Sequence, residues 1–148
     1  MLLLTACAIE PEQAIVVDHA GMADGNATAS IPGHAHPMAS LDGLPELVQT
    51  ADVRTQEAYR FATANPDAAR EVPCYCGCVG LGHTSSYDCY VAGTAAGGAL
   101  EYELHAANCT VCVDITQDQM RLMDDGNSPD TIRAFLAENY AQYGPPTQ

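Results

Sequence analysis

Three cysteines alternate with other residues in the segment Pro73-Cys74-Tyr75-Cys76-Gly77-Cys78, near the middle of the chain. Proline disfavours helix in the residue before it, and side chains two apart on an extended backbone point to the same face. If the segment is extended, its thiols face one way, with neighbouring thiols roughly 7 Å apart at the backbone. Gly77 allows the strand to bend. The spacing therefore predicts three thiols that converge on one ion or cluster after small rotamer adjustments.

The region around this segment is predicted to be irregular. Residues 73–102 are rich in glycine, cysteine and serine, and only a short hairpin around the turn Gly97-Gly98 is expected. A stretch of about thirty residues without regular structure is uncommon inside a compact domain. We therefore expect something other than an apolar core to hold this region together.

A second group of candidate ligands has the spacing His105-x-x-x-Cys109-x-x-Cys112. On a helix, offsets of four and three residues place one imidazole and two thiols on the same face. Cysteines in the first turn of a helix also have a lowered thiol pKa, because the unpaired N–H groups favour the thiolate. This pattern predicts a ligand set on the start of a helix, provided that the helix begins at about His105.

Helices are predicted on both sides of the irregular region. A helix over residues 44–64 is indicated by apolar residues that share one face at a period of 3.6: Leu44, Leu47, Val48, Ala51, Ala58 and Phe61. Asn65-Pro66 supplies a cap and a first helical proline for a short helix that ends before Pro73. The chain is thus expected to be mainly α.

Two further helices follow the irregular region. The first runs over about 105–125 and stops at Gly126 and Asn127. The second begins at Ser128-Pro129 and carries an apolar stripe up to Gly144. Met120 and Met123 are assigned to the core, because eight helical residues place Met120 about 12 Å from Cys112. We therefore predict a small helical domain of about three to four helices with an irregular Cys/Gly-rich centre.

The N-terminal residues have the pattern of a lipoprotein signal. Met1-Leu2-Leu3-Leu4-Thr5-Ala6-Cys7 ends in an aliphatic residue, two small residues and a cysteine, so Cys7 is the predicted lipid attachment site. Residues 1–6 are interpreted as a truncated signal remnant and residues 7–41 as a flexible tether. The domain is expected over 42–144 and a tail over 145–148. These features predict an extracytoplasmic protein that is lipid-anchored to the bacterial cell membrane.

Composition narrows the class of partner. The 148-residue chain has 5 Lys+Arg against 19 Asp+Glu, a formal net charge of −14. Nucleic acid is excluded as an expected partner, because binding a phosphate backbone needs a basic surface. An acidic surface raises the local concentration of cations. No pattern indicates a hydrolase or another enzyme, so we expect a non-enzymatic protein of about one domain.

The segment 73–78 spells the motif of a known family, and the chain resembles the PCYCGC-motif family of bacterial lipoproteins over about residues 44–144. The resemblance continues through a further set of matching positions: Gly82-His83, Asp88-Cys89, His105-Ala106-Ala107, Cys109 to Ile115, Ser128 and Ile132-Arg133. It implies a lipidated, exported protein and carries over no activity.

Two uses of the six domain cysteines compete. An even number of cysteines in a small exported domain is typical of three structural disulfides. Disulfides within Cys-x-Cys or Cys-x-x-Cys close very small loops and would constrain little chain entropy, although pairing between the two clusters escapes this objection. A mixed arrangement, with one disulfide bond and a metal site of four ligands, is a further alternative. We favour metal binding, with thiol–disulfide exchange and a structural or partner-binding surface protein as alternatives.

The candidate metal is copper. Thiolate and imidazole ligands favour Cu(I) or zinc over magnesium or calcium, and a zinc ribbon would need two Cys-x-x-Cys knuckles where this chain has one. An iron–sulfur cluster would need a different spacing. The predicted ligands are Cys74, Cys76, Cys78, Cys109 and Cys112, with Cys89, His83 and His105 as further ligands or as groups that hydrogen-bond to the ligands.

The predicted tether supports the choice of copper. It carries histidines and methionines suited to weak copper capture: His19, Met22, His34, His36 and Met38. The sequence therefore predicts a copper-binding lipoprotein for capture, storage or delivery of the ion, with another copper-handling protein as a candidate partner.

Overall fold

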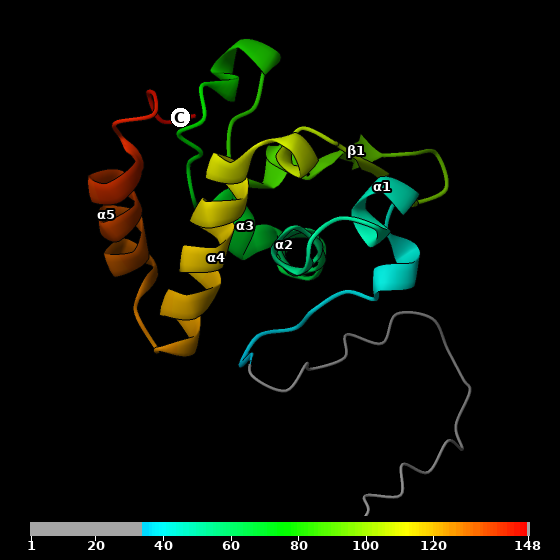
Figure 1. The fold of residues 1–148 in the computed structure, drawn as a ribbon, viewed down its shortest axis with the longest axis horizontal. Coiled ribbons are helices and arrows are strands. Elements are labelled where there is room, and N and C mark those ends of the chain that lie inside the picture. The colour runs from blue at the N-terminus through cyan, green and yellow to red at the C-terminus, as the bar shows by residue number, and fades with distance from the viewer. Residues whose placement is uncertain (1–33, 148) are drawn as a thin grey trace, which may run out of the picture.

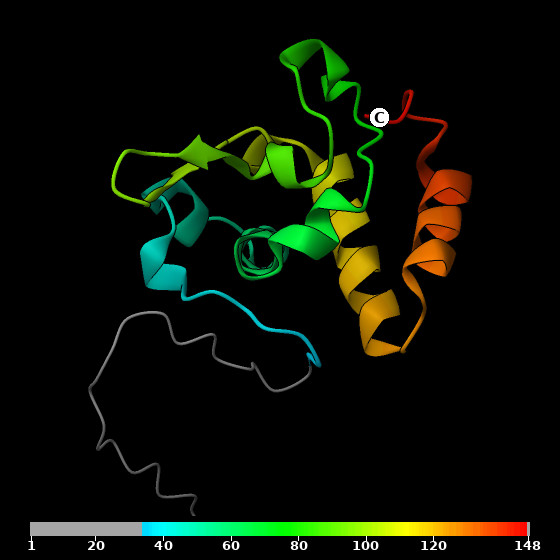
Figure 2. The same cartoon turned by 180° about the vertical axis from the view of Figure 1, so that it is seen from behind.

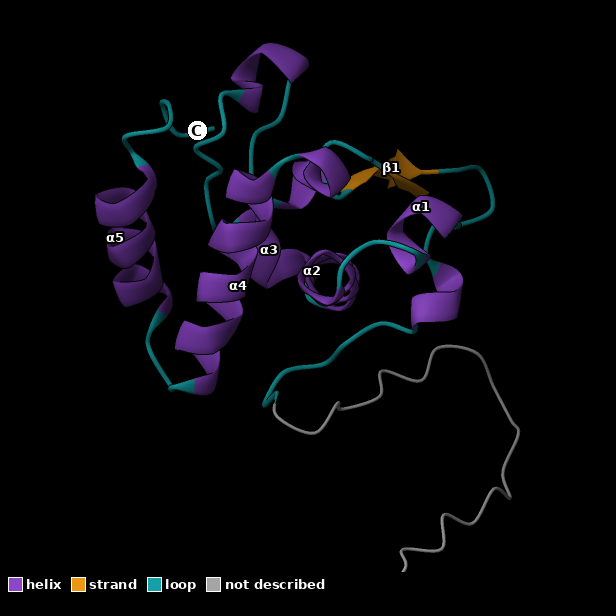
Figure 3. Ribbon diagram, in the orientation of Figure 1, coloured by secondary structure: helices purple, strands orange, loops and turns teal. Residues whose placement is uncertain are grey.

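The structure is a computed structural model, and it describes residues 34–147. The prediction of a mainly α fold is confirmed (Figure 3). Helix α1 spans Glu46–Gln49, α2 Val53–Ala64, α3 Pro66–Arg70, α4 Thr110–Asp124 and α5 Pro129–Tyr140, and the one small sheet of the described residues pairs β1, Val91–Thr94, with β2, Leu100–Tyr102. No helix of residues 34–147 is both long and apolar enough to cross a membrane.

Three helices enclose the core. Helix α2 is seen end-on in Figure 1, whereas α4 lies in the plane, so the two cross steeply, and α5 runs back alongside α4. Their facing sides bury Tyr59 and Phe61 of α2, Ile115 and Met120 of α4 and Leu136 of α5. The assignment of Met120 to the core is confirmed, and Met123 packs against the core partly buried.

The predicted helix over residues 44–64 is wrong as a single element, because the chain breaks between α1 and α2. Asp52 caps α2 by accepting hydrogen bonds from the Thr55 N–H at 3.1 Å and the Thr55 hydroxyl at 2.7 Å. The Gln56 side chain donates to the carbonyls of Gln49 and Ala51, both at 2.9 Å. These side-chain hydrogen bonds satisfy backbone groups that a continuous helix would have paired. The helix therefore breaks at Asp52 although the apolar residues keep a helical period.

Other helix ends follow the sequence more closely. Ser128 accepts from the Thr131 N–H at 3.3 Å and begins α5, and Gly126 has the left-handed φ of 77° expected after α4. The helix at Pro66 begins as predicted, but the Asn65 side chain does not cap it and instead donates to the carbonyls of Phe61 and Pro37. The hairpin turn contains Gly97 and Gly98 in left-handed conformations, as predicted.

The expected tether and tail boundaries need correction where the structure describes them. Met38 is fully buried and His36 is 5 % exposed, so residues 34–41 belong to the packed domain. At the other end, Thr147 is buried and exchanges two hydrogen bonds with Cys74, at 2.8 and 2.9 Å. Both ends of the described chain therefore pack against the folded domain. The predictions for Cys7, His19 and Met22 lie outside the described residues.

The irregular region lies beside the N-terminal end of α4. Short 3-10 turns, η2 at Cys78–Leu81, η3 at Tyr87–Cys89 and η4 at Ala106–Asn108, are joined there by loops. Figure 2 shows from behind that these loops, the start of α4 and the C-terminal residues gather at one end of the molecule. All six cysteines of the described chain are on these elements.

Candidate metal centre

Two groups of four side chains in this region have ligand atoms within 4.8 Å of one another. The first group is Cys74, Cys76, Cys78 and Cys89, and the second is Cys76, His105, Cys109 and Cys112. Cys76 belongs to both. Six cysteines that are distant in sequence thus gather in space, as a single ligand set requires. We call these six thiols, together with His83 and His105, the thiol cluster.

Sulfur–sulfur distances in the thiol cluster suit a shared coordination sphere. Cys74 and Cys76 are 3.2 Å apart, Cys76 and Cys112 3.4 Å, Cys74 and Cys112 3.6 Å, and Cys78 and Cys89 3.7 Å. Tetrahedral thiolates bonded to zinc at about 2.3 Å lie about 3.7 Å from one another. A disulfide bond is about 2.05 Å long, so none of the described cysteines is in a disulfide.

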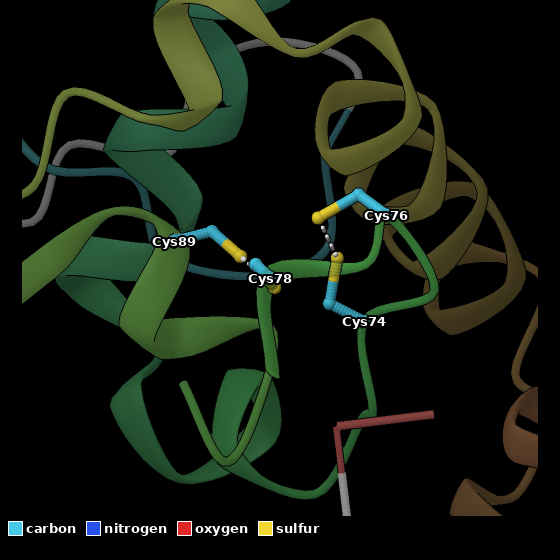
Figure 4. A group of neighbouring side chains, drawn as sticks. All are labelled: Cys74, Cys76, Cys78 and Cys89. Atoms are coloured by element: carbon cyan, nitrogen blue, oxygen red, sulfur yellow. Dashed lines mark hydrogen bonds between the residues drawn. The ribbon is translucent and has the colours of Figure 1, made fainter. Parts of the chain in front are cut away.

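The segment 73–78 brings its thiols together by bending. Gly77 has a left-handed φ of 80° and turns the chain into η2, so Cys78 faces Cys89 of η3, as Figure 4 shows. Residues other than glycine rarely adopt this backbone conformation. The expected alternation therefore holds for Cys74 and Cys76, while Cys78 reaches the same group through the turn.

The expected helix over residues 105–125 is wrong in its first turn. His105 precedes the 3-10 turn η4, Cys109 is extended with φ −129° and ψ 101°, and α4 starts only at Thr110. His105 therefore does not share a helical face with Cys109 and Cys112. It joins them by another route, because the bent loop places its Nε2 3.4 Å from the Cys76 sulfur.

His83 also lies at the thiol cluster. Its Nδ1 is 3.5 Å from the Cys89 sulfur, and its ring meets the His105 ring edge to face with centroids 5.6 Å apart. The loop that carries His83 is fixed by Asp88, whose carboxylate accepts from the Thr84 N–H, the Thr84 hydroxyl and the Ser85 N–H. The structure thus places all eight sequence-predicted ligands at this site.

Burial leaves one side of the thiol cluster open. Cys74, Cys78, Cys89 and Cys112 are buried, whereas Cys76, Cys109, His83 and His105 are partly exposed. Four thiols are therefore shielded from solvent, and the four remaining donors are accessible to it.

The hydrogen bonds of the thiol cluster favour the thiolate form of Cys76. Hydrogen bonds from Cys112 and then from Cys74 lower the pKa of Cys76, which favours its thiolate. Burial raises the pKa of Cys78. Hydrogen bonding with Cys74 and then Cys76 raises the pKa of Cys112, so the expected lowering by the helix start does not hold there. Neighbouring thiols cannot all ionise without a cation to offset their charges.

Two tyrosines that the sequence reasoning missed hold the loops in place. The Tyr59 hydroxyl donates to the Glu103 carbonyl at 2.8 Å and accepts from the Ala107 N–H at 3.1 Å, which fixes the loop around His105. The Tyr90 hydroxyl donates to the Cys112 carbonyl at 2.8 Å. Nothing in the sequence separates these tyrosines from ordinary core residues, because their partners are backbone groups of distant segments.

The sequence reasoning also missed Gly144, whose backbone packs closely against the segment 73–78. A Cβ built on Gly144 would lie 2.9 Å from the Tyr75 carbonyl oxygen and 3.3 Å from the Gly77 nitrogen. Only glycine allows the C-terminal segment to approach this closely. The sequence signal was a glycine before Pro145-Pro146, which indicates a helix stop and not a contact.

Replacing Gly144 by alanine is expected to displace the backbone of Cys74 to Cys78 and to destabilise the domain by about 1–3 kcal/mol, the usual cost of overpacking. Urea unfolding measures the loss, and the rate at which an aromatic disulfide reagent labels the thiols should rise. Gly43→Ala is the matched control, because nothing lies within 4 Å of its added Cβ. Equal stability of the two variants would contradict the assigned contact.

The fold and the thiol cluster together define a small, mainly helical, cysteine-rich protein whose clustered thiols could hold a metal ion. The chain belongs to the family of proteins of unknown function with a PCYCGC motif, whose sequence profile matches residues 1–148. Comparisons with curated proteins and with solved structures give no match.

Proposed function

We propose that this protein is an extracytoplasmic, membrane-anchored copper-binding lipoprotein that captures, stores or delivers Cu(I). The observation that carries the proposal is the convergence of six thiols, with Cys76 shared between two four-ligand groups. Thiolates are soft ligands that select Cu(I), zinc or iron–sulfur clusters among biological metals. The proposal assigns the protein no enzymatic reaction.

The burial pattern supports copper capture. Four buried thiols protect a bound Cu(I) ion from oxidation, and the partly exposed Cys76, Cys109 and His105 can accept an ion from solution or pass it to a partner protein. The net charge of −14 favours the approach of cations. Zinc remains the second metal that this ligand set suits, and competition between the two ions distinguishes them.

Uptake of Cu(I) by the reduced protein tests the proposal. The reduced chain, handled without oxygen, should remove Cu(I) from a colorimetric chelator, and an excess of Zn²⁺ should not displace it. Prior oxidation should abolish uptake, because a thiol in a disulfide no longer offers a thiolate. If the reduced protein fails to hold copper against a weak chelator and native material contains three disulfides, the structural alternative is correct.

Thiol–disulfide exchange is the second candidate function. It is favoured by the lowered pKa of Cys76, for which the hydrogen bond from Cys112 is the largest cause, and by its partial exposure. This candidate predicts that reduced protein transfers electrons to a model disulfide and that bound copper blocks the reaction. A rate no faster than that of free cysteine would exclude it.

Anchoring is tested by replacing Cys7 with serine in the full-length precursor. A lipobox cysteine is the residue that is lipidated, so the variant should move from the membrane to the soluble fraction with its domain still folded. Fractionation and immunoblotting measure the distribution, and Cys109→Ser serves as a cysteine control that keeps the anchor. Membrane retention of the Cys7→Ser protein would refute lipidation at this residue.

A further inference from the structure

A second cluster of ligand-type side chains lies away from the thiols. His34 and His36 precede α1, and Asp124 is the last residue of α4. The Nδ1 of His34 is 3.1 Å from Oδ2 of Asp124, and the Nδ1 of His36 is 3.1 Å from Oδ1. Ligand atoms of the three residues lie within 4.8 Å of one another.

His36 has no conventional partner in this cluster. Its side chain is buried, with 5 % of the residue exposed, and neither ring nitrogen makes a hydrogen bond within residues 34–147. Its Nδ1 forms only an ion-pair contact with Asp124. The ring packs edge-on against Phe61 with centroids 4.9 Å apart. Buried polar atoms are normally paired, so a buried imidazole aimed at a carboxylate without a hydrogen bond calls for an explanation.

The protonation state of His36 suits a ligand. Burial lowers the pKa of His36, and this exceeds the opposing effect of Asp124. The neutral imidazole is the form that binds metal ions. Asp124 is also the last residue of α4, where the helix dipole disfavours a negative charge. A cation held between the three side chains would offset this charge.

The spacing of the donors matches a coordination sphere. Nitrogen and oxygen ligands bond to zinc at about 2.0–2.2 Å, so neighbouring ligands of a tetrahedral site lie about 3.3–3.6 Å apart. The two nitrogen–oxygen distances of 3.1 Å are close to this range, and small side-chain rotations would bring them into it. Two imidazoles and a carboxylate are borderline ligands, which prefer Zn²⁺ or Cu²⁺ to the Cu(I) favoured by thiolates.

We propose that His34, His36 and Asp124 bind one divalent transition-metal ion of the Zn²⁺ or Cu²⁺ class, at a site separate from the thiol cluster. Twelve helical residues separate Cys112 from Asp124, which is about 18 Å along the axis of α4. Figures 1 and 2 both show the start of the described chain beside the far end of α4, opposite the cysteine-bearing loops. The site does not depend on the proposed function of the thiols.

Binding at this site would fasten the N-terminal segment to the domain. The Ala35 N–H already donates to the Asp124 carboxylate at 2.7 Å, so a hydrogen bond holds the segment 34–36 at the end of α4. A bound ion would add a second link between this segment and Asp124, through the two histidines. It would thereby fix the position of residues 34–36 on the domain.

Cadmium-113 NMR on the full chain tests the proposal, because sulfur-rich and nitrogen/oxygen sites give well-separated resonances. One nitrogen/oxygen resonance is expected in addition to any sulfur resonance. It should disappear in Asp124→Asn and persist in Asp125→Asn, the adjacent exposed carboxylate. Zn²⁺ should displace cadmium from it, and Cu²⁺ should give an electron paramagnetic resonance spectrum with nitrogen couplings.

The outcomes separate this site from the thiol cluster. His34→Gln provides a second variant at a more exposed position, and circular dichroism checks that each variant is folded. Absence of a nitrogen/oxygen resonance in the wild type would overturn the proposal, and so would a resonance that survives in both Asp124→Asn and His34→Gln. If the wild type gives the nitrogen/oxygen resonance but no sulfur resonance, the result counts against copper binding by the thiol cluster and supports this site.

Discussion

Replacing Cys76 by serine is expected to lower the affinity for Cu(I) by more than about 100-fold, since loss of a second-shell partner alone costs about 10–100-fold at metal sites. Cys76 belongs to both four-ligand groups. It lies 3.2 Å from Cys74, 3.4 Å from Cys112 and 3.4 Å from the Nε2 of His105. Its removal therefore breaks both groups at once, and titration against a chelator of known affinity measures the loss.

Cys109→Ser is the matched comparison for this prediction. Cys109 is partly exposed like Cys76 but belongs to one group only, so its replacement should leave the group of Cys74, Cys76, Cys78 and Cys89 intact. The variant should retain part of the copper at high affinity. Equal losses of copper affinity in the two variants would contradict the shared role of Cys76 and would indicate that the two groups act as independent sites.

Loading the reduced protein with Cu(I) is expected to raise the melting temperature by more than about 10 °C. A ligand present at about 1,000 times its dissociation constant stabilises the folded state by about 4 kcal/mol. For a domain of about 100 residues, each kcal/mol corresponds to roughly 4 °C or more. The physical reason is that the ion joins segments that the unfolded chain keeps far apart, from Cys74 to Cys112.

Calorimetry under reducing conditions measures this shift. Copper should raise the melting temperature of Cys76→Ser far less than that of the wild type, while the two metal-free proteins should melt within a few degrees of each other because Cys76 is only partly buried. A shift of the same size in both proteins would show that copper stabilises the domain somewhere other than the thiol cluster.

Much of the candidate site was visible in the sequence because its ligands are chemically unusual residues at short spacings. The segment 73–78 and the spacing of His105, Cys109 and Cys112 supplied six of the eight predicted residues, Cys89 and His83 were added to them, and the structure places all eight together. The geometry differed in its details. Cys109 is the extended residue before α4 and not part of it, because η4 ends at Asn108 and the helix starts anew at Thr110.

The second cluster shows the opposite case. His34 and His36 were interpreted as weak copper-capture residues of a flexible tether, because a segment of alanine, glycine and proline has no apolar period. Asp124 was one acidic residue among nineteen. Nothing local connects the two, since their meeting depends on how the N-terminal segment crosses the core beside Phe61.

The sequence by itself determined the helical class, most helix ends and which thiols are candidate ligands, because apolar period, caps and cysteine spacing are local properties. The break at Asp52 was decided by side-chain hydrogen bonds that compete with that period. Only the tertiary structure decided which sulfurs meet, that Cys76 lies between two groups, and that Gly144 and Thr147 pack on the segment 73–78. Contacts between segments about seventy residues apart depend on the packing of α2, α4 and α5, and no local pattern encodes that packing.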